Sequence, residues 1–202
     1  MAVDRDPVVI LSYARTPMGS FQGALAGATA TQLGADAVRG AVGRSGVSAA
    51  DIERIYMGCV LPAGLGQAPA RQAAIGAGLG DHVEATTVNK MCGSGMQAAI
   101  LAADALAAGS VELLVAGGME SMTNAPYLSK SHRGGARIGH DRMYDHMYLD
   151  GLEDAVMADA RAAAMLGHQI GRVGHALHAA RDDDVGRPRR DGVGGHHHRL
   201  HS

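Results

Sequence analysis

Residues 86–108 read T-T-V-N-K-M-C-G-S-G-M-Q-A-A-I-L-A-A-D-A-L-A-A, a short apolar strand that passes through a turn into a long helix of small residues. Cys92 lies at the junction of strand and helix. A thiol near the first turn of a helix faces unsatisfied backbone N–H groups and the positive end of the helix dipole, and both favour thiolate over thiol. Gly93 and Gly95 leave room for a substrate to approach the sulfur closely. This placement indicates a nucleophile.

The helix that follows Cys92 is apolar almost all round. Its residues at helical spacing are Met96, Ala99, Ile100, Ala103 and Leu106, and most of the others are alanine. A helix of this composition is predicted to be buried. A buried helix is a rigid support, which a precisely placed catalytic thiol requires.

The residues alone leave a second interpretation of Cys92 open. A single intracellular cysteine is most often a small buried side chain without chemistry. The glycines around Cys92, together with Gly109 at the end of the helix, favour a nucleophile without deciding the question. For Cys59, on a predicted strand, we prefer the inert interpretation because no helix terminus or nearby cation would ionise its thiol.

Length and composition are those of a globular domain. An apolar fraction of 47% over 202 residues suffices for one core, so one domain is the first expectation. The net charge of −2 provides no basic surface for nucleic acid or membrane lipid. We expect a cytoplasmic protein with reduced thiols, because the N-terminus does not resemble a secretory signal and no apolar run has membrane length. A disulfide between Cys59 and Cys92 is disfavoured.

Strands and helices are predicted to alternate along the chain. Apolar runs of strand length occupy residues 7–13, 54–60, 84–88 and 111–116, and the first is predicted to be central in a sheet. Helix signals mark residues 29–44, 69–78 and the segment after Cys92; Thr29 or Thr31 caps the first helix and Gly46 closes it. The alternation predicts an α/β fold in which helices are layered on a mixed, largely parallel sheet. Ligands on such sheets bind near strand ends, where Cys92 lies.

The segment around Cys92, V-N-K-M-C-G-S-G-M-Q-A-A, resembles the nucleophile segment of thiolases, which make or cleave the carbon–carbon bond of 3-ketoacyl-CoA. Three further stretches resemble thiolase motifs in the same order: R-T-P-M-G-S-F-Q-G at 15–23, G-G-M-E-S-M-T-N-A-P-Y-L at 117–128 and D-G-L-E-D-A at 150–155. Four ordered motifs are a specific match. The resemblance covers residues 7 to about 155, similar to the N-terminal half of a thiolase.

The resemblance implies a thiolase N-terminal domain over residues 1–155 with a loop region at 119–149. It also implies acetyl-CoA C-acetyltransferase activity, in which Cys92 takes an acetyl group as a thioester and a second acetyl-CoA carbanion attacks it, reversibly, to give acetoacetyl-CoA and CoA. Leu152 is implied in substrate binding. Coenzyme A thioesters are the expected substrates, no cofactor or metal is expected, and the implied assembly is a homo-oligomer, a tetramer in full-length relatives.

The periodicity of the sequence fades between Ser121 and Tyr148. In thiolases the corresponding excursion joins dimers into tetramers and helps to shape the acyl and pantetheine site, which the resemblance implies here. The excursion is basic, with Lys130, His132, Arg133, Arg137, His140 and Arg142. Attraction to CoA phosphates is one interpretation. A solvated loop or subunit contact is favoured, because the basic residues lack a glycine-rich strand-to-helix turn.

Residues 156–202 do not follow the family's pattern. A thiolase would continue with a loop domain over CoA and a second half that repeats the fold of the first, and its catalytic His, Asn and second Cys belong to that half. We therefore expect a truncated chain that does not complete the thiolase cycle alone. The alternative is a catalytically dead fragment, truncated or frameshifted, that retains only oligomerisation surfaces.

The tail is predicted to be disordered beyond a weak helix at 155–166, because Asp, Arg, Gly and His without an apolar period cannot build a core. Its histidines are His168, His175, His178, His196, His197, His198 and His201. Clustered histidines chelate metals, but no carboxylate or cysteine has the spacing of a structured site, so an unstructured His-rich run is favoured. The abrupt change in composition motivates the hypothesis of a coding region read out of frame.

Overall fold

Three parallel strands form the sheet in the computed structural model, which describes residues 8–155. They are β1 (Arg54–Gly58), β2 (Glu84–Val88) and β3 (Leu114–Gly118), in the order β2-β1-β3. Gly58 at the end of β1 pairs with Val88 on one side and Gly118 on the other. The three strands therefore end at the same edge of the sheet, and the turn with Cys92 follows there.

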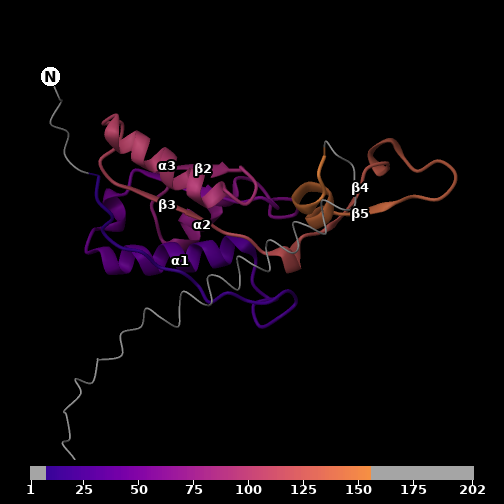
Figure 1. Cartoon of the computed structure of the whole chain (residues 1–202), viewed down its shortest axis with the longest axis horizontal. Helices are drawn as coiled ribbons and strands as arrows, with labels where there is room; N and C mark the ends of the chain where they lie inside the picture. Colours follow the sequence, from indigo (N-terminus) through magenta and orange to yellow (C-terminus); the bar gives the residue numbers. More distant parts are fainter. Residues whose placement is uncertain (1–7, 156–202) are drawn as a thin grey trace, which may run out of the picture. The chain divides into compact units, whose positions relative to one another are not determined.

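Helices cover both faces of this sheet (Figure 1). One layer contains α1 (Ala30–Ser45) and α2 (Pro69–Ala77), which pack on each other, and α2 also packs on β1 and β2. The helix α3 (Ser94–Ala107) packs on β1 and β3 from the other side. The predicted α/β fold with layered helices on a parallel sheet is confirmed.

Local signals explain where α1 begins and ends. The Thr29 hydroxyl accepts the N–H of Gln32, and the Gln32 side chain accepts the N–H of Thr29, which is a capping box. Gly46 ends the helix with φ of 78°, a left-handed conformation that glycine adopts without strain. The sequence predicted Gly46 as the end of the helix and Thr29 or Thr31 as its cap, and Thr29 is the cap in the structure.

The main core lies between the sheet and the layer of α1 and α2. Its largest fully buried side chains are Ile52, Ile55, Met57, Val83 and Cys59. Along β1, Ile55 and Met57 alternate with half-buried neighbours, so one face of the strand points into this core. Ala70, Ala73 and Ala74 bring α2 close to the sheet, as expected for a chain poor in aromatic residues.

The third strand begins later than predicted, at Leu114 instead of residue 111. The Glu53 carboxylate accepts the N–H groups of Glu112 at 2.7 Å and Leu113 at 3.2 Å. These hydrogen bonds lower the pKa of Glu53 below its usual range, and the bond from Glu112 has the largest effect. Because a side chain satisfies both amides, strand pairing starts one residue further on, where Arg54 pairs with Leu114.

The predicted central strand at 7–13 is wrong for the described part of that segment. Residues 8–13 join no sheet, and all except the half-buried Ser12 are exposed, with Ile10 87% exposed. The Ser12 hydroxyl donates to the Ala41 carbonyl at 2.5 Å, so this segment is attached to α1. Its apolar composition alone did not suffice to place it in the sheet, since residues 8–13 pair with no strand.

The prediction that α3 is buried all round is also wrong. Only Ser94, Ala98 and Ala102 are buried, and they form the face towards the sheet. Met96 is 71% exposed and Ile100 is also exposed. The described residues supply one layer against α3, and its apolar outer face has no covering layer among them.

The excursion after β3 contains short regular elements. A 3-10 turn, η2 (Met122–Asn124), leads to β4 (Tyr127–Ser129), which pairs in antiparallel fashion with β5 (Met143–Asp145), and η3 (His132–Gly134) lies between these strands. A π-helical turn, η4 (Tyr148–Leu152), follows. The region predicted as a long loop, 119–149, is thus a hairpin with flanking turns. The predicted tail at 156–202 lies outside the described residues.

Gly58 provides a test of the contact between β1 and α3. A Cβ at this position would lie 2.6 Å from both the Gly95 nitrogen and the Ser94 carbonyl carbon, which are backbone atoms that cannot move aside. Gly58→Ala is therefore expected to lower the free energy of unfolding by about 2 kcal/mol in urea denaturation. Gly43→Ala, on α1 with open space around the new Cβ, is the control and should stabilise the helix by up to about 1 kcal/mol. Equal stability of Gly58→Ala and the parent would contradict the contact.

Candidate functional site

Glycines allow the start of α3 to lie directly on the ends of two strands. The Gly118 position faces the Gly95 Cα, 3.4 Å from where a Cβ would be, and Gly58 faces the Gly95 nitrogen more closely. Side chains at Gly58 or Gly118 would push the helix outward. The turn that carries Cys92 is consequently placed over the carboxyl edge of the sheet.

Cys92 is exposed and directly precedes the N-cap residue of α3, Gly93. No side chain caps this helix. Within residues 8–155 the N–H groups of Gly95 and Met96 have no hydrogen-bond partner. Cys92 therefore directly precedes a helix start with unsatisfied N–H groups. Its role as a nucleophile stays a prediction.

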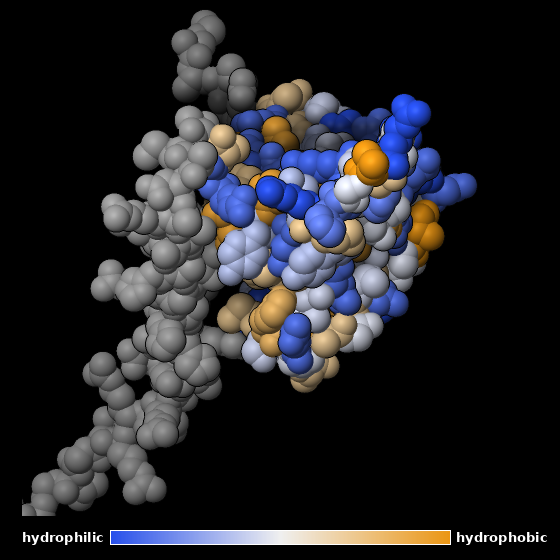
Figure 2. All heavy atoms as spheres, turned by 90° about the vertical axis from the view of Figure 1, so that its right-hand side faces the viewer, coloured by the Kyte–Doolittle hydropathy of each residue, from blue (hydrophilic) through white to orange (hydrophobic). Residues whose placement is uncertain are grey.

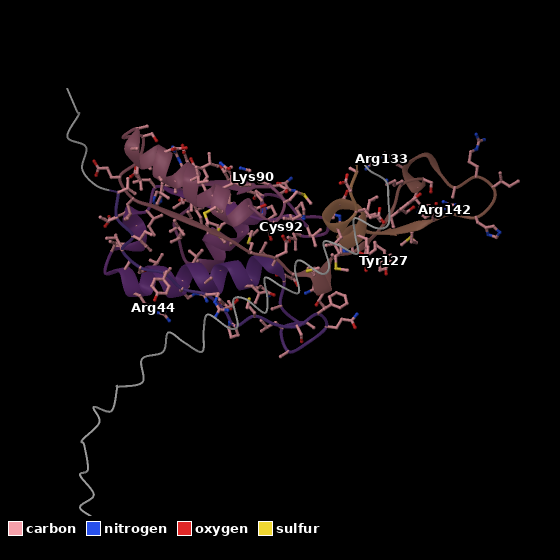
Figure 3. The ribbon with its side chains drawn as sticks, viewed as in Figure 1. Arg44, Lys90, Cys92, Tyr127, Arg133 and Arg142 are labelled. Atoms are coloured by element: carbon pink, nitrogen blue, oxygen red, sulfur yellow. The ribbon has the colours of Figure 1, made fainter. Side chains whose placement is uncertain are left out.

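The turn before Cys92 is held by side chains that the sequence did not single out. Asn89 Oδ1 accepts the Met91 N–H at 3.0 Å, and its Nδ2 donates to the Val60 carbonyl at 3.4 Å. Ser94 Oγ donates to the Met91 carbonyl at 2.6 Å and accepts the Lys90 N–H at 2.9 Å. Lys90 and Cys92 lie at the same end of α3 (Figure 3).

Cys59 has the opposite environment from Cys92. Its side chain is 1% exposed, and its thiol donates a hydrogen bond of 3.6 Å to Glu120 Oε1. Burial first, and then the Glu120 charge, raises the pKa of the Cys59 thiol to about 12. Both cysteines are free, in agreement with the disfavoured disulfide.

Glu120, which follows β3, forms hydrogen bonds with the chain directly after β1. Its carboxylate accepts the N–H groups of Val60 at 2.7 Å and Leu61 at 3.0 Å. Both amides follow directly after Cys59, so one carboxylate fixes the path of the chain there. No sequence signal predicted this role, because the partners of Glu120 are main-chain groups sixty residues away.

Leu152 is half-buried at the end of η4. This turn is anchored by His146, which is 4% exposed: its Nδ1 lies 2.6 Å from Asp150 Oδ2, and its Nε2 accepts the Ala63 N–H at 3.3 Å. No hydrogen bond or ion pair in the described part of the chain links Leu152 to Cys92. The substrate-binding role of Leu152 stays a prediction.

The basic residues of the excursion belong to the hairpin, and Arg133 and Arg142 lie apart from Cys92 (Figure 3). Asp141 accepts hydrogen bonds from Ser129 and Ser131, and the bond from Ser131 contributes most to lowering the pKa of this carboxyl. The face seen from the hairpin side is mostly hydrophilic where it is visible, with hydrophobic side chains in small separate groups (Figure 2). A solvated or contact loop remains the favoured interpretation.

An open groove of about 480 Å³ lies between α1 and α2, lined by residues such as Gln32, Asp36, Arg39, Gln72 and Gly76. Cys92 is not among its lining residues. Among residues 8–155 no group of three or more His, Cys, Asp or Glu side chains is arranged to hold a metal ion. No helix in this part of the chain has the length and hydropathy to cross a membrane.

The two thiols provide a labelling test. Cys92 should be alkylated by iodoacetamide at neutral pH at least about tenfold faster than Cys59, because only exposed thiols with accessible thiolate react readily. Peptide mapping at short times measures both rates, after circular dichroism has shown that the chain is folded. Equal labelling of the two cysteines in a folded chain would contradict the site.

The raised pKa of Cys59 predicts a loss of stability at high pH. The unfolded thiol ionises near its ordinary value of 9.0 whereas the folded thiol keeps its proton to about 12, so the folded state binds more protons between these values. Stability should therefore fall as the pH rises above 9, by up to about 1.4 kcal/mol per pH unit. Cys59→Ala should show a shallower fall in urea unfolding between pH 8 and about pH 10.5. Parallel curves for the two proteins would contradict the assignment.

Comparison with known proteins gives a consistent result. The family model for the thiolase N-terminal domain matches residues 8–183, continuing past the boundary predicted at 155, which stays a prediction. The acetyl-CoA acetyltransferase of Saccharomyces pastorianus is 47% identical over 186 residues, 91% of this chain and 44% of the yeast protein. A cytosolic acetyl-CoA acetyltransferase of Gibberella zeae is 48% identical over 76% of this chain and 39% of its own length.

A mitochondrial acetyl-CoA acetyltransferase of Xenopus laevis is 50% identical over 73% of this chain and 34% of its own length. The chain thus spans less than half the length of the curated relatives it matches. The family model covers most of the chain, and the α/β fold around Cys92 agrees with it. The chain belongs to the thiolase family of enzymes.

Proposed function

We propose that this chain carries the acyl-accepting cysteine of an acetyl-CoA C-acetyltransferase, which converts two molecules of acetyl-CoA into acetoacetyl-CoA and CoA, reversibly. The observation that carries the proposal is the exposed Cys92 thiol beside the uncapped start of α3. The names of the relatives support acetyl-CoA as the substrate. As one of these relatives is named cytosolic, we also propose a cytoplasmic location.

The proposed reaction proceeds in two thiol steps. The Cys92 thiolate attacks the carbonyl carbon of acetyl-CoA, the bond between that carbon and the CoA sulfur breaks, and CoA leaves as a thiolate that takes up a proton. A second acetyl-CoA then loses a methyl proton to a base, and its carbanion attacks the acetyl group on Cys92. The cysteine leaves as a thiolate, and acetoacetyl-CoA is released.

The described residues supply the nucleophile without its base. Within residues 8–155 no side chain forms a hydrogen bond or an ion pair with the Cys92 thiol. We propose that the proton transfers of both steps use groups from outside these residues. We propose that the chain alone accepts an acetyl group slowly and does not form the carbon–carbon bond.

The excursion contributes in two further ways. Leu152, held on η4 by the anchor through His146, is proposed to contact the acyl or pantetheine part of the substrate. The hairpin is proposed to mediate assembly into a homo-oligomer, because Ile138 at 98% exposure and the exposed Tyr127 and Met143 are apolar surface suited to a subunit contact.

The same exposed apolar surface supports a second candidate function. A fragment that retained only oligomerisation surfaces would present the hairpin and the outer face of α3 with Met96 and Ile100, and would carry out no chemistry. Acylation of Cys92 distinguishes the two candidates, because a binding fragment has no need of a reactive thiol.

Incubation of the folded chain with acetyl-CoA tests the proposal. Intact-mass and peptide analysis should find one acetyl group on Cys92 and none in Cys92→Ser, whereas Cys59→Ala, which removes only the buried thiol, should still be acetylated. Acetoacetyl-CoA should not accumulate. A folded chain that stays unacetylated, or that is acetylated equally in Cys92→Ser, would support the fragment instead.

A further inference from the structure

Met91, directly before Cys92, has an unusual backbone conformation. Its φ is 50°, in the left-handed region that residues with a side chain rarely adopt. Among residues 8–155, Gln22 and Ala68 are the other non-glycine residues with positive φ. Such a conformation costs on the order of 1–3 kcal/mol and persists only where neighbouring groups enforce it.

Side chains hold both peptide groups of Met91. Asn89 accepts its N–H, while Ser94 donates to its carbonyl. At Gln22 one side chain, that of Thr123, accepts the N–H, and at Ala68 the carbonyl accepts main-chain N–H groups of α2. Met91 is thus the member of this group that side chains restrain on both sides, and it is the one next to the candidate nucleophile.

Both restraining side chains are themselves anchored. The Asn89 amide donates to the Val60 carbonyl, and the N–H of Val60 is held by Glu120. Ser94 is 5% exposed and packs against the end of β1, with its Cβ 2.8 Å from where a Cβ of Gly58 would lie. The restraints on Met91 therefore lead back to the ends of β1 and β3, which are rigid parts of the sheet.

We propose that Asn89 and Ser94 are positioning residues that hold Met91 in the left-handed conformation and thereby direct the Cys92 side chain towards its substrate. The proposal rests on the proposed function, in which Cys92 accepts the acyl group. Neither residue touches the reacting atoms; both act through the Met91 backbone. Without them Met91 relaxes to negative φ, and because φ of one residue sets the direction of the chain after it, Cys92 turns away from the start of α3.

Glycine at position 91 makes the proposal testable independently of overall stability. Glycine populates positive φ about as readily as negative φ. A glycine at position 91 therefore depends less than methionine on the hydrogen bonds of Asn89 and Ser94. If Asn89 acts by enforcing φ, then Met91→Gly should rescue Asn89→Ala. If Asn89 merely stabilises the fold, Asn89→Ala should lower the melting temperature and leave the alkylation rate of the folded chain at the parent value, so that there is no rate for Met91→Gly to restore.

The experiment measures iodoacetamide alkylation of Cys92 at neutral pH in the full chain, with thermal melts and amide hydrogen exchange alongside. Asn89→Ala and Ser94→Ala should each slow alkylation roughly threefold or more and speed exchange of the peptide around Met91, with the cooperative melt retained. The double variant Asn89→Ala/Met91→Gly should recover most of the parent rate. Met91→Gly alone should stay close to the parent.

Matched controls remove similar groups elsewhere. Ser110→Ala deletes a hydroxyl that donates to the Ala105 carbonyl at the far end of α3, and Asn124→Ala deletes an amide that joins two loops. Both should alkylate at the parent rate. Parent rates in Asn89→Ala and Ser94→Ala, or a double variant as slow as Asn89→Ala, would overturn the proposal. A chain that alkylates as expected but is never acetylated would refute the proposed function alone.

Discussion

The arrangement of the site depends on the approach of α3 to the end of β1. The backbone of Ser94 and Gly95 lies so close to Gly58 that no side chain fits between them. This contact places the start of a helix directly above the ends of three parallel strands. No side chain caps this helix, and within residues 8–155 the N–H groups of Gly95 and Met96, which follow closely after Cys92, have no hydrogen-bond partner. Close packing of glycine thus determines where the start of α3 lies relative to the strand ends.

Signals that act within a few residues were readable from the sequence. A threonine cap at 29 or 31, the end of the helix at Gly46 and the strand at 84–88 were predicted because each depends on neighbours along the chain. The predictions of a strand at 7–13 and of a buried α3 were wrong. Apolar composition indicates that burial of a segment would be favourable, but it does not show which other element would bury it. Within residues 8–155 the segment at 8–13 pairs with no strand and the outer face of α3 has no covering layer, so these apolar residues are exposed.

The site shows the same division. The position of Cys92 between a strand end and a helix start could be predicted because these surroundings are contiguous in the sequence, and its role as a nucleophile stays a prediction. The role of Glu120 could not be predicted. Its carboxylate accepts the main-chain N–H groups of Val60 and Leu61, and every residue except proline has such a group, so the sequence does not mark these partners. Asn89 and Ser94 stand within three residues of Cys92, but their role depends on the φ of Met91, and a methionine in a sequence gives no sign of a left-handed backbone.

The hydrogen bonds that hold the turn before Cys92 are made entirely by residues 8–155. Each hydrogen bond that fixes the turn comes from the strand ends, from the turn itself or from the first residue of α3. These contacts do not involve the uncovered outer face of α3 or the exposed segment at 8–11. The conformation of the turn that carries Cys92 therefore does not require the layers that the described residues lack. In the proposed reaction the base comes from outside these residues. The proposal thus assigns the positioning of the thiol to residues 8–155 and proton transfer to other groups.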